Sequence, residues 1–359
     1  MERTDLAMVE RIRKLGGFDL SACYSCGACS AVCPLSKDEL SFPRKMIRYS
    51  LLGLENRILA SPEPWLCYYC GECSKTCPRE ADPGGLMMAL RRFTIRTYSI
   101  GRVADAFYSA FASGVAWIVL TAIAIAAVFL FYNPAMDLAK VDFLSFISLD
   151  DIHVAGIAIV VFIMAAFLAN IWIMYRSMRR GPHGAAFSVS NVKGSSMRAL
   201  REVALQERFG ECEDNKFRRW AHLAVSWGFM GMFLATCIIA AVDFKWIPLP
   251  RWVSLVIGSV SGAATLLGLG YYVYLRLSRR TEYSKYSHHT DWVFLALLAL
   301  SVVSGYVMVA LRFLHMPMAA YWTFAFHLVF VFNLLISLPF TKFAHIVYRP
   351  VALWLAGVK

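Results

Sequence analysis

The chain has 359 residues, of which 58% are hydrophobic and 17% are charged, and its mean hydropathy is +0.54. Soluble globular domains are rarely so apolar, so a purely soluble protein, a disordered chain and a collagen-like chain are excluded. The 36 Lys and Arg against 24 Asp and Glu give a net charge of +12. Long uncharged runs alternate with basic segments, which indicates a membrane rather than nucleic acid as the reason for the basic charge.

The N-terminal part of the chain differs sharply from the rest. Its first twenty residues are charged throughout and lack the apolar core of a secretory signal, which predicts that this part stays in the cytoplasm. Eight of the ten cysteines lie between Cys23 and Cys77. In a reducing compartment clustered cysteines are metal ligands rather than disulfides. We therefore predict a cytoplasmic metal-binding domain over residues 1–104 and a membrane domain over residues 105–359.

The clustered cysteines form two runs with the spacing C-x2-C-x2-C-x3-C-P, which is typical of two [4Fe–4S] clusters. In each run three close thiolates bind one cube, and the fourth cysteine, followed by proline, binds the other cube. A zinc site has two C-x2-C pairs and closes with four ligands, so zinc does not fit this spacing. The insert between the runs contains helix-like stretches, which predicts a helical two-cluster ferredoxin fold. The expected ligand sets are Cys23, Cys26, Cys29 and Cys77 for one cluster and Cys67, Cys70, Cys73 and Cys33 for the other.

Six apolar runs are long enough to cross a bilayer, which takes about 20 residues. The loops on the outer side carry four of the 36 Lys and Arg, so the other 32 lie on the cytoplasmic side with both chain ends. We expect an all-α protein of the inner membrane, with a six-helix haem-b bundle after the ferredoxin domain. The runs are Ala112–Phe131, Val154–Met174, Ala221–Val242, Trp252–Leu275, Trp292–Leu311 and Ala320–Phe340.

Histidines within the membrane are functional candidates, because an unsatisfied polar group is costly there. His327 and His345 lie 18 residues apart, and we expect both on the last helix. That spacing is about five turns, which places both rings on one face about 27 Å apart, with Pro339 kinking the helix at most. His222 has nearly the depth of His345, so these two are expected to hold an inner haem b between them.

The outer haem, expected on His327, has two candidates for its second ligand. Met232 has about the same depth as His327 by residue count, and methionine is a permitted haem ligand opposite histidine. His153 lies closer to the outer interface but is the more usual ligand type. The residues alone leave both open.

The motifs that carry these ligands resemble known families. The runs SCGACSAVCP and LCYYCGECSKTCP, followed by LRR at residues 90–92, resemble the small ferredoxin-type C subunit of heterodisulfide reductases. The body from about Ile152 resembles the haem-b gamma subunit of respiratory nitrate reductase and the membrane E subunit of heterodisulfide reductase. A chain joining both parts is similar to the QmoC family, the membrane component of the quinone-interacting membrane-bound oxidoreductase.

The resemblance implies a membrane oxidoreductase subunit that transfers electrons between menaquinone and soluble partners through two haems b and two [4Fe–4S] clusters. The implied partners are QmoA- and QmoB-like flavin and iron–sulfur proteins related to the A subunit of heterodisulfide reductase, serving adenylylsulfate reductase. By analogy, the quinone site is expected at the outer end near Arg312 and Lys245. The nitrate reductase pattern has a second histidine ten residues after the one at His222, where this chain has Met232.

Two alternatives remain open at this point. In one, the membrane domain is a heterodisulfide-reductase-type anchor without quinone chemistry. In the other, it is a membrane carrier whose iron–sulfur clusters act as a redox sensor and whose histidines relay protons. The carrier predicts no haem, and the anchor predicts no reduction by a quinol.

Overall fold

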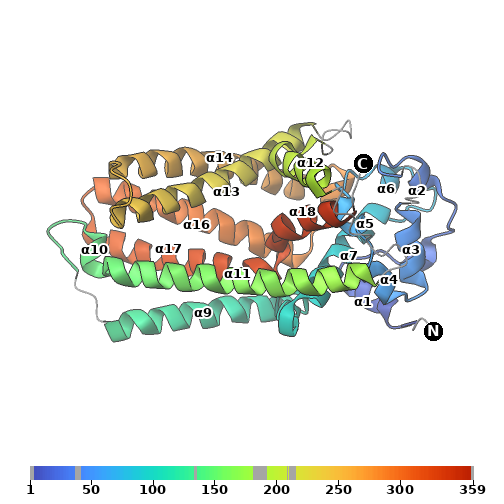
Figure 1. The fold of residues 1–359 in the computed structure, drawn as a ribbon, viewed down its shortest axis with the longest axis horizontal. Coiled ribbons are helices and arrows are strands. Elements are labelled where there is room, and N and C mark those ends of the chain that lie inside the picture. The colour runs from blue at the N-terminus through green and yellow to red at the C-terminus, as the bar shows by residue number, and fades with distance from the viewer. Residues whose placement is uncertain are drawn as a thin grey trace.

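The structure is a computed structural model that describes residues 4–36, 42–132, 136–180, 192–207, 209 and 216–356. Every regular element in these ranges is a helix, so the prediction of an all-α protein is confirmed. A head of short helices lies at one end of a bundle of long helices, and both ends of the chain lie at the head end (Figure 1).

The head is organised around α7 (Pro83–Tyr98), whose residues Met87 and Leu90 are fully buried. The helix begins after Asp82, whose carboxylate accepts a hydrogen bond from the Gly85 N–H at 2.8 Å. Short helices surround it because proline, glycine and the cysteine loops interrupt the chain. They are α1 (Met8–Lys14), η1 (Leu20–Ala22), α2 (Ala28–Ala31), α3 (Arg44–Leu51), α4 (Glu55–Leu59), α5 (Glu63–Leu66), α6 (Glu72–Lys75), η2 (Ile100–Arg102) and α8 (Asp105–Tyr108).

Six helices of the described chain are long and apolar enough to cross a bilayer, as the sequence predicts. They run side by side along the long axis of the molecule (Figure 1). The short helices α10 (Phe143–Phe146), α12 (Val192–Leu205) and α15 (Glu282–Lys285) lie in the connections. The six long helices are α9 (Phe111–Tyr132), α11 (Leu149–Arg179), α13 (Lys216–Asp243), α14 (Arg251–Ser278), α16 (His289–Phe313) and α17 (Pro317–Ser337).

Small residues bring α13 and α14 into close contact. A Cβ atom on Gly228 would lie 2.6 Å from the Ser261 carbonyl oxygen, and one on Gly268 would lie 2.5 Å from the Ala221 carbonyl oxygen. Such contacts are typical of membrane helices, which associate through close packing rather than through a hydrophobic driving force. This pair therefore forms a rigid support for His222 on α13.

The expectation that His327 and His345 share one helix is wrong. α17 ends at Ser337 and is followed by the 3-10 turns η6 (Leu338–Phe340) and η7 (Lys342–Ala344), and α18 (His345–Ala356) is a separate helix. Pro339 has no N–H to continue the ladder, and Thr341 is extended, with φ −111° and ψ −174°. The buried Asn170 of α11 donates its side-chain amide to the Pro339 carbonyl oxygen at 3.2 Å, which stabilises the break.

Candidate functional site

The two cysteine motifs of the head have the same backbone conformation. In each motif, the residue before the second cysteine and the glycine after it have positive φ. This turn lets a backbone N–H donate to the first thiol: Ser25 to Cys23 Sγ at 3.4 Å, and Tyr69 to Cys67 Sγ at 3.2 Å. Hydrogen bonds of this kind are among the factors that set the potential of a bound cluster. The φ angles are 55° for Ser25, 54° for Tyr69, and 91° for both Gly27 and Gly71.

At the second motif, four cysteines line one common cavity. Three of them belong to the motif itself, and the fourth, Cys33, comes from the end of the first motif. Among the described residues, no group of three or more His, Cys, Asp or Glu side chains is arranged to hold a single metal ion. Thiols from both motifs line this one cavity, which is compatible with the donor set of a multi-iron cluster. The four are Cys33, Cys67, Cys70 and Cys73.

The first motif is closer to the surface. Burial raises the pKa of the Cys29 thiol, and the neighbouring Cys23 and Cys26 raise it further, so these three lie together. Cys26 is exposed to solvent. The expected fourth ligand, Cys77, follows α6, which packs against α2. For the described residues the structure gives no direct contact of the Cys77 thiol with the other three.

Burial favours the protonated thiols of Cys33, Cys67 and Cys73 over their thiolates in the absence of iron. Burial raises the pKa of Cys33 to about 12 and also raises the pKa of Cys67 and Cys73. Only the thiolate binds metal, so iron must displace these protons. We expect cluster assembly to release protons and to stabilise the folded conformation of the motif.

His222 and His345 face each other at the head end of the membrane bundle. Their ring centroids lie 6.1 Å apart with an interplanar angle of 63°, although they come from different helices, α13 and α18. Burial lowers the pKa of His345 to about 4, so its ring is neutral at pH 7. Two neutral imidazoles that face each other across such a gap are a suitable donor pair for one haem iron.

The second ring nitrogen of each histidine is held by an oxygen acceptor. His222 Nδ1 contacts the Gln206 side-chain oxygen at 2.8 Å, and Ser226 Oγ lies 3.2 Å away. His345 Nδ1 donates to the Lys342 carbonyl oxygen at 2.7 Å. Because an amide or carbonyl oxygen only accepts, the proton sits on Nδ1 in both rings, and Nε2 keeps its lone pair for a metal. This arrangement fits an inner haem b.

His327 lies on α17, within the membrane span. Its Nδ1 contacts Ser304 Oγ of α16 at 2.9 Å, so this ring also has a partner that orients it. The neighbouring residue Gly305 adds no side chain beside the ring, and a Cβ there would be 3.5 Å from His327 Cε1. The His327 ring is therefore oriented by a hydrogen-bond partner, as the rings of His222 and His345 are.

The two residues expected opposite His327 have other contacts. His153 Nε2 lies 3.9 Å from a carboxylate oxygen of Asp243, and its ring stacks on Phe244 with centroids 4.2 Å apart. Met232 is partly buried on α13, and its carbonyl oxygen accepts from Thr236 at 3.1 Å. The structure does not bring either residue into direct contact with His327 among the interactions of the described chain.

The two residues expected at the quinone site lie at the end of the bundle away from the head. Arg312 is exposed in the last turn of α16. Lys245 is exposed in the turn after α13, with φ 59°. Neither forms an ion pair with another described residue, and nothing in the structure relates them to a common cavity.

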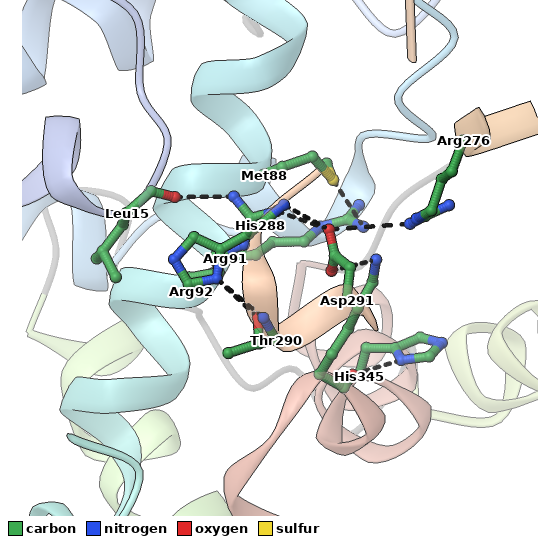
Figure 2. A network of polar contacts seen from close by, with 10 residues as sticks. Leu15, Met88, Arg91, Arg92, Arg276, His288, Thr290, Asp291 and His345 are labelled. Carbon is green, nitrogen blue, oxygen red and sulfur yellow. Dashed lines mark hydrogen bonds and ion pairs between the residues drawn. The ribbon is translucent and has the colours of Figure 1, made fainter. Parts of the chain in front are cut away.

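A buried ionic network joins the head to the membrane helices (Figure 2). The Asp291 carboxylate at the start of α16 is 3% exposed and lies 2.7 Å from Lys342 Nζ, 3.2 Å from Arg92 Nη2 and 3.8 Å from Arg276 Nη2. Arg92 belongs to the head, and Lys342 is the residue whose carbonyl oxygen holds His345. One carboxylate therefore fixes the position of α7 relative to the helix that carries His345.

Sequence reasoning missed Asp291 and Gln206, and it misplaced His288. Asp291 is the one acidic residue of α16, and a charge at the start of an apolar run was the available signal. The basic loop around His288 predicts a solvated ring; the residue is instead 4% exposed, and its ring nitrogen accepts from the Thr290 N–H at the start of α16. No sequence signal pointed to Gln206, because it lies in a polar connection far from His222 along the chain.

Two family models match the chain. Residues 19–81 match the family described as 4Fe-4S dicluster domain, and residues 110–357 match the family described as citrate utilization protein B. The second match covers more than two thirds of the chain. The head is therefore a 4Fe-4S dicluster domain, as the cysteine spacing predicts.

Curated relatives match part of the chain. The heterodisulfide reductase C-subunit-like protein of Archaeoglobus profundus is 38% identical over 106 residues, which are 29% of this chain and 56% of the relative. The C subunit of the H(2):CoB-CoM heterodisulfide,ferredoxin reductase of Methanothermobacter thermautotrophicus is 34% identical over 62 residues, which are 17% of this chain and 34% of the relative. The chain thus spans about half or less of the length of these relatives. No solved structure matches it.

Proposed function

We propose that this chain, which belongs to the family described as citrate utilization protein B, is the membrane subunit of a menaquinone-dependent oxidoreductase complex. Its likeness to the C subunits of heterodisulfide reductases supports an electron-transfer role, and its two cysteine motifs and six apolar helices fit a QmoC-like membrane protein. Bound haems b and [4Fe–4S] clusters supply one-electron transfer, which protein side chains cannot perform themselves. The chain's own residues hold these groups at fixed positions between the membrane and a soluble partner.

The observation that carries the proposal is the His222–His345 pair. Two imidazoles 6.1 Å apart, each with Nδ1 bound to an oxygen, lie where the membrane bundle meets the head. A proton relay would not need both rings in the tautomer that frees Nε2, whereas metal ligation does. We assign these two residues to an inner haem b and His327 to an outer one, with Met232 or His153 as its second ligand.

The head is proposed to hold two clusters with crossed ligands. One is bound by Cys33, Cys67, Cys70 and Cys73, which line a common cavity. The other is assigned to Cys23, Cys26, Cys29 and Cys77. The division into a ferredoxin domain over residues 1–104 and a membrane domain over residues 105–359 stays a prediction.

The orientation and the partners belong to the proposal as well. We place the chain in the inner membrane with the head in the cytoplasm, because the expected outer loops carry only four Lys and Arg. The curated relatives support partner subunits of the heterodisulfide reductase type. We propose QmoA- and QmoB-like partners, a link to adenylylsulfate reductase, and menaquinone bound at the outer end near Arg312 and Lys245.

An optical spectrum of the purified full-length protein, with and without dithionite, tests the haem assignment. We expect reduced b-type absorption, and we expect His345→Ala to remove the inner component while His315→Ala, a change at an exposed histidine, leaves the spectrum unchanged. A protein without b-type absorption would contradict the proposal and favour a carrier with an iron–sulfur sensor.

Reduction of the haems by a menaquinol analogue tests the quinone assignment. A quinol oxidoreductase should show b-type reduction under anaerobic conditions before any dithionite is added. If dithionite but not the quinol analogue reduces the haems, the membrane domain is an anchor without quinone chemistry. Arg312→Gln and Lys245→Gln then show whether the outer end contributes to the reaction with the quinol.

A further inference from the structure

The two helices that carry the inner histidine pair each carry an arginine four residues away. Arg218 precedes His222 on α13, and Arg349 follows His345 on α18. Residues four apart lie on the same face of a helix. Each histidine therefore has a guanidinium-bearing residue about one turn away on its own helix.

Both arginines bind the backbone of the second cysteine motif. Arg218 donates to the Tyr69 carbonyl oxygen at 2.6 Å and to the Tyr68 carbonyl oxygen at 3.3 Å. Arg349 donates to the Leu66 carbonyl oxygen at 3.5 Å, and its guanidinium carbon lies 3.8 Å from the centroid of the Tyr68 ring. The residues on both sides of Cys67 are thus held by the helices that present the histidines.

A third arginine completes the arrangement from the head. Arg91 of α7 donates to the Pro64 carbonyl oxygen at 2.5 Å and also to the carbonyl oxygen of Cys67 itself. The segment from Pro64 to Tyr69 is thus contacted by cations from both domains. A second, independent contact comes from α15 of the membrane domain, because a Cβ on Gly71 would lie 2.7 Å from Glu282 Cβ.

The first motif lacks such contacts with the membrane domain among the described residues. A Cβ on Gly27, which corresponds to Gly71, would meet only the side chain of Arg44 from the head, at 3.6 Å. Tyr24, which corresponds to Tyr68, is 70% exposed, whereas Tyr68 is 7% exposed. The equivalent motifs therefore differ in one respect: the second one is fixed to the histidine-bearing helices, and the first one faces solvent.

We infer that Arg218 and Arg349 are positioning residues that hold the Cys67–Cys73 motif next to the His222–His345 pair and raise the reduction potential of the cluster bound there. The inference rests on the proposed function, both for the haem at the histidine pair and for the cluster at this motif. Positive charge close to a cluster stabilises its reduced, more negative form, and the effect is large where solvent does not screen it. The Cys23–Cys29 motif is then the one that meets the soluble partner.

The test is a redox titration of the full-length protein followed by electron paramagnetic resonance of both clusters. We expect Arg218→Gln and Arg349→Gln each to lower the midpoint potential of one cluster by about 59 mV, a tenfold change in the equilibrium constant of a one-electron couple. Arg218→Lys keeps the positive charge, so its cluster should keep most of the wild-type midpoint potential that Arg218→Gln loses. Cys26→Ser alters the signal of the cluster at the first motif. The comparison identifies the cluster whose midpoint potential has shifted.

Arg79→Gln is the matched control. Arg79 is exposed and its guanidinium lies 4.4 Å from the Tyr24 ring centroid, as that of Arg349 lies over Tyr68. Solvent screening should leave its effect on either potential small. Unchanged potentials in both glutamine variants, or a shift of the cluster of the first motif instead, would overturn the inference.

The experiment separates failure of this inference from failure of the proposed function. Cluster potentials are measured whether or not haem is present, so a protein without b-type absorption removes the haem assignment and leaves the arginine effect to be measured. If one glutamine variant does not accumulate, the other carries the test, since the two arginines lie on different helices and reach the same loop. A potential that Arg218→Lys fails to restore would contradict a role for the charge.

Discussion

The two cysteine motifs of the head have the same spacing and the same backbone angles but opposite surroundings. Tyr24 in the first motif and Tyr68 in the second both lie under an arginine, at 4.4 Å and 3.8 Å from the ring centroid. Tyr24 is 70% exposed and Tyr68 is 7% exposed. A local repeat of sequence thus produces a local repeat of structure, while the position of each copy in the fold decides what surrounds it.

The two motifs share the residues that select the cluster type and differ in the surroundings that set its potential. Four thiolates at fixed spacing select the cluster type, whereas burial, nearby charge and hydrogen bonds set its potential. The buried copy is next to the membrane helices, and the exposed copy is available to a partner. Four substitutions, each with a matched control, test whether the surroundings of a residue decide its effect.

Removing one ligand from each motif should have unequal consequences for stability. Cys67→Ala and Cys26→Ala are each expected to remove about half of the iron and acid-labile sulfide, since each cluster takes four thiolates. Cys67 lines the buried cavity and Cys26 is exposed, so Cys67→Ala should lower the melting temperature more. Metal analysis and thermal unfolding of both variants check this, and equal melting temperatures would contradict the comparison.

The buried Asp291 carboxylate at the junction should contribute more to stability than the partly exposed carboxylate of Asp105. Asp291→Asn leaves Arg92 and Lys342 without their buried partner, which is expected to cost about 3–5 kcal/mol. Asp105→Asn is the control, because Asp105 pairs with Arg96 at 2.7 Å but is 32% exposed, and we expect about 0–1 kcal/mol. Denaturant unfolding in detergent measures both, and a similar cost would mean that the junction does not depend on Asp291.

The two equivalent glycines allow a matched substitution. Gly27→Ala and Gly71→Ala both place a side chain at φ 91°, which costs roughly 1–2 kcal/mol. Gly71→Ala also meets Glu282 Cβ at 2.7 Å, and such overpacking adds about 1–3 kcal/mol. Thermal unfolding should therefore rank Gly71→Ala as the less stable variant, and the reverse order would place the first motif at the interface.

The smallest expected effect concerns the orientation of His222, one of the two proposed ligands of the inner haem. Gln206→Ala removes the acceptor 2.8 Å from His222 Nδ1, while Ser226 Oγ at 3.2 Å remains. Loss of such a partner typically weakens metal binding by roughly 10- to 100-fold, and we expect about tenfold because one acceptor is left. The rate of haem transfer to an apo-haem protein measures the loss, with Ser226→Ala as the weaker comparison. An unchanged rate would show that Gln206 does not orient the ring.

Much of the architecture could be predicted because it depends on local patterns. The spacing of eight cysteines specifies a two-cluster head, and the family match to a 4Fe-4S dicluster domain confirms it. The six membrane helices follow from the length and hydropathy of six runs, because a bilayer requires about 20 apolar residues whatever their order. The positions of His222, His327 and His345 along the chain were likewise available from the sequence alone.

The proximity of His222 to His345 and of Cys33 to the second motif was predicted, but other contacts between distant segments were not. The pattern after His327 predicts a helix that continues through Pro339 to His345, yet the helix breaks after Ser337, because Asn170 from another helix binds the Pro339 carbonyl oxygen. A single sequence does not reveal which buried amide will satisfy a freed carbonyl group, since that partner lies 169 residues away. Asp291 differs, because its charge at the start of an apolar run was visible in the sequence, whereas its partner Arg92 lies 199 residues away.

Local sequence patterns specified the cluster ligands and the membrane helices of this protein, because thiolate spacing and the length of an apolar run depend only on neighbouring residues. The tertiary structure alone decided the contacts that lock these parts together: Asn170 on the Pro339 carbonyl oxygen, Arg92 beside Asp291, and Arg218 on the Cys67 loop. Each of these contacts joins segments far apart in the chain. Their formation depends on how whole helices pack, and no local pattern encodes that packing.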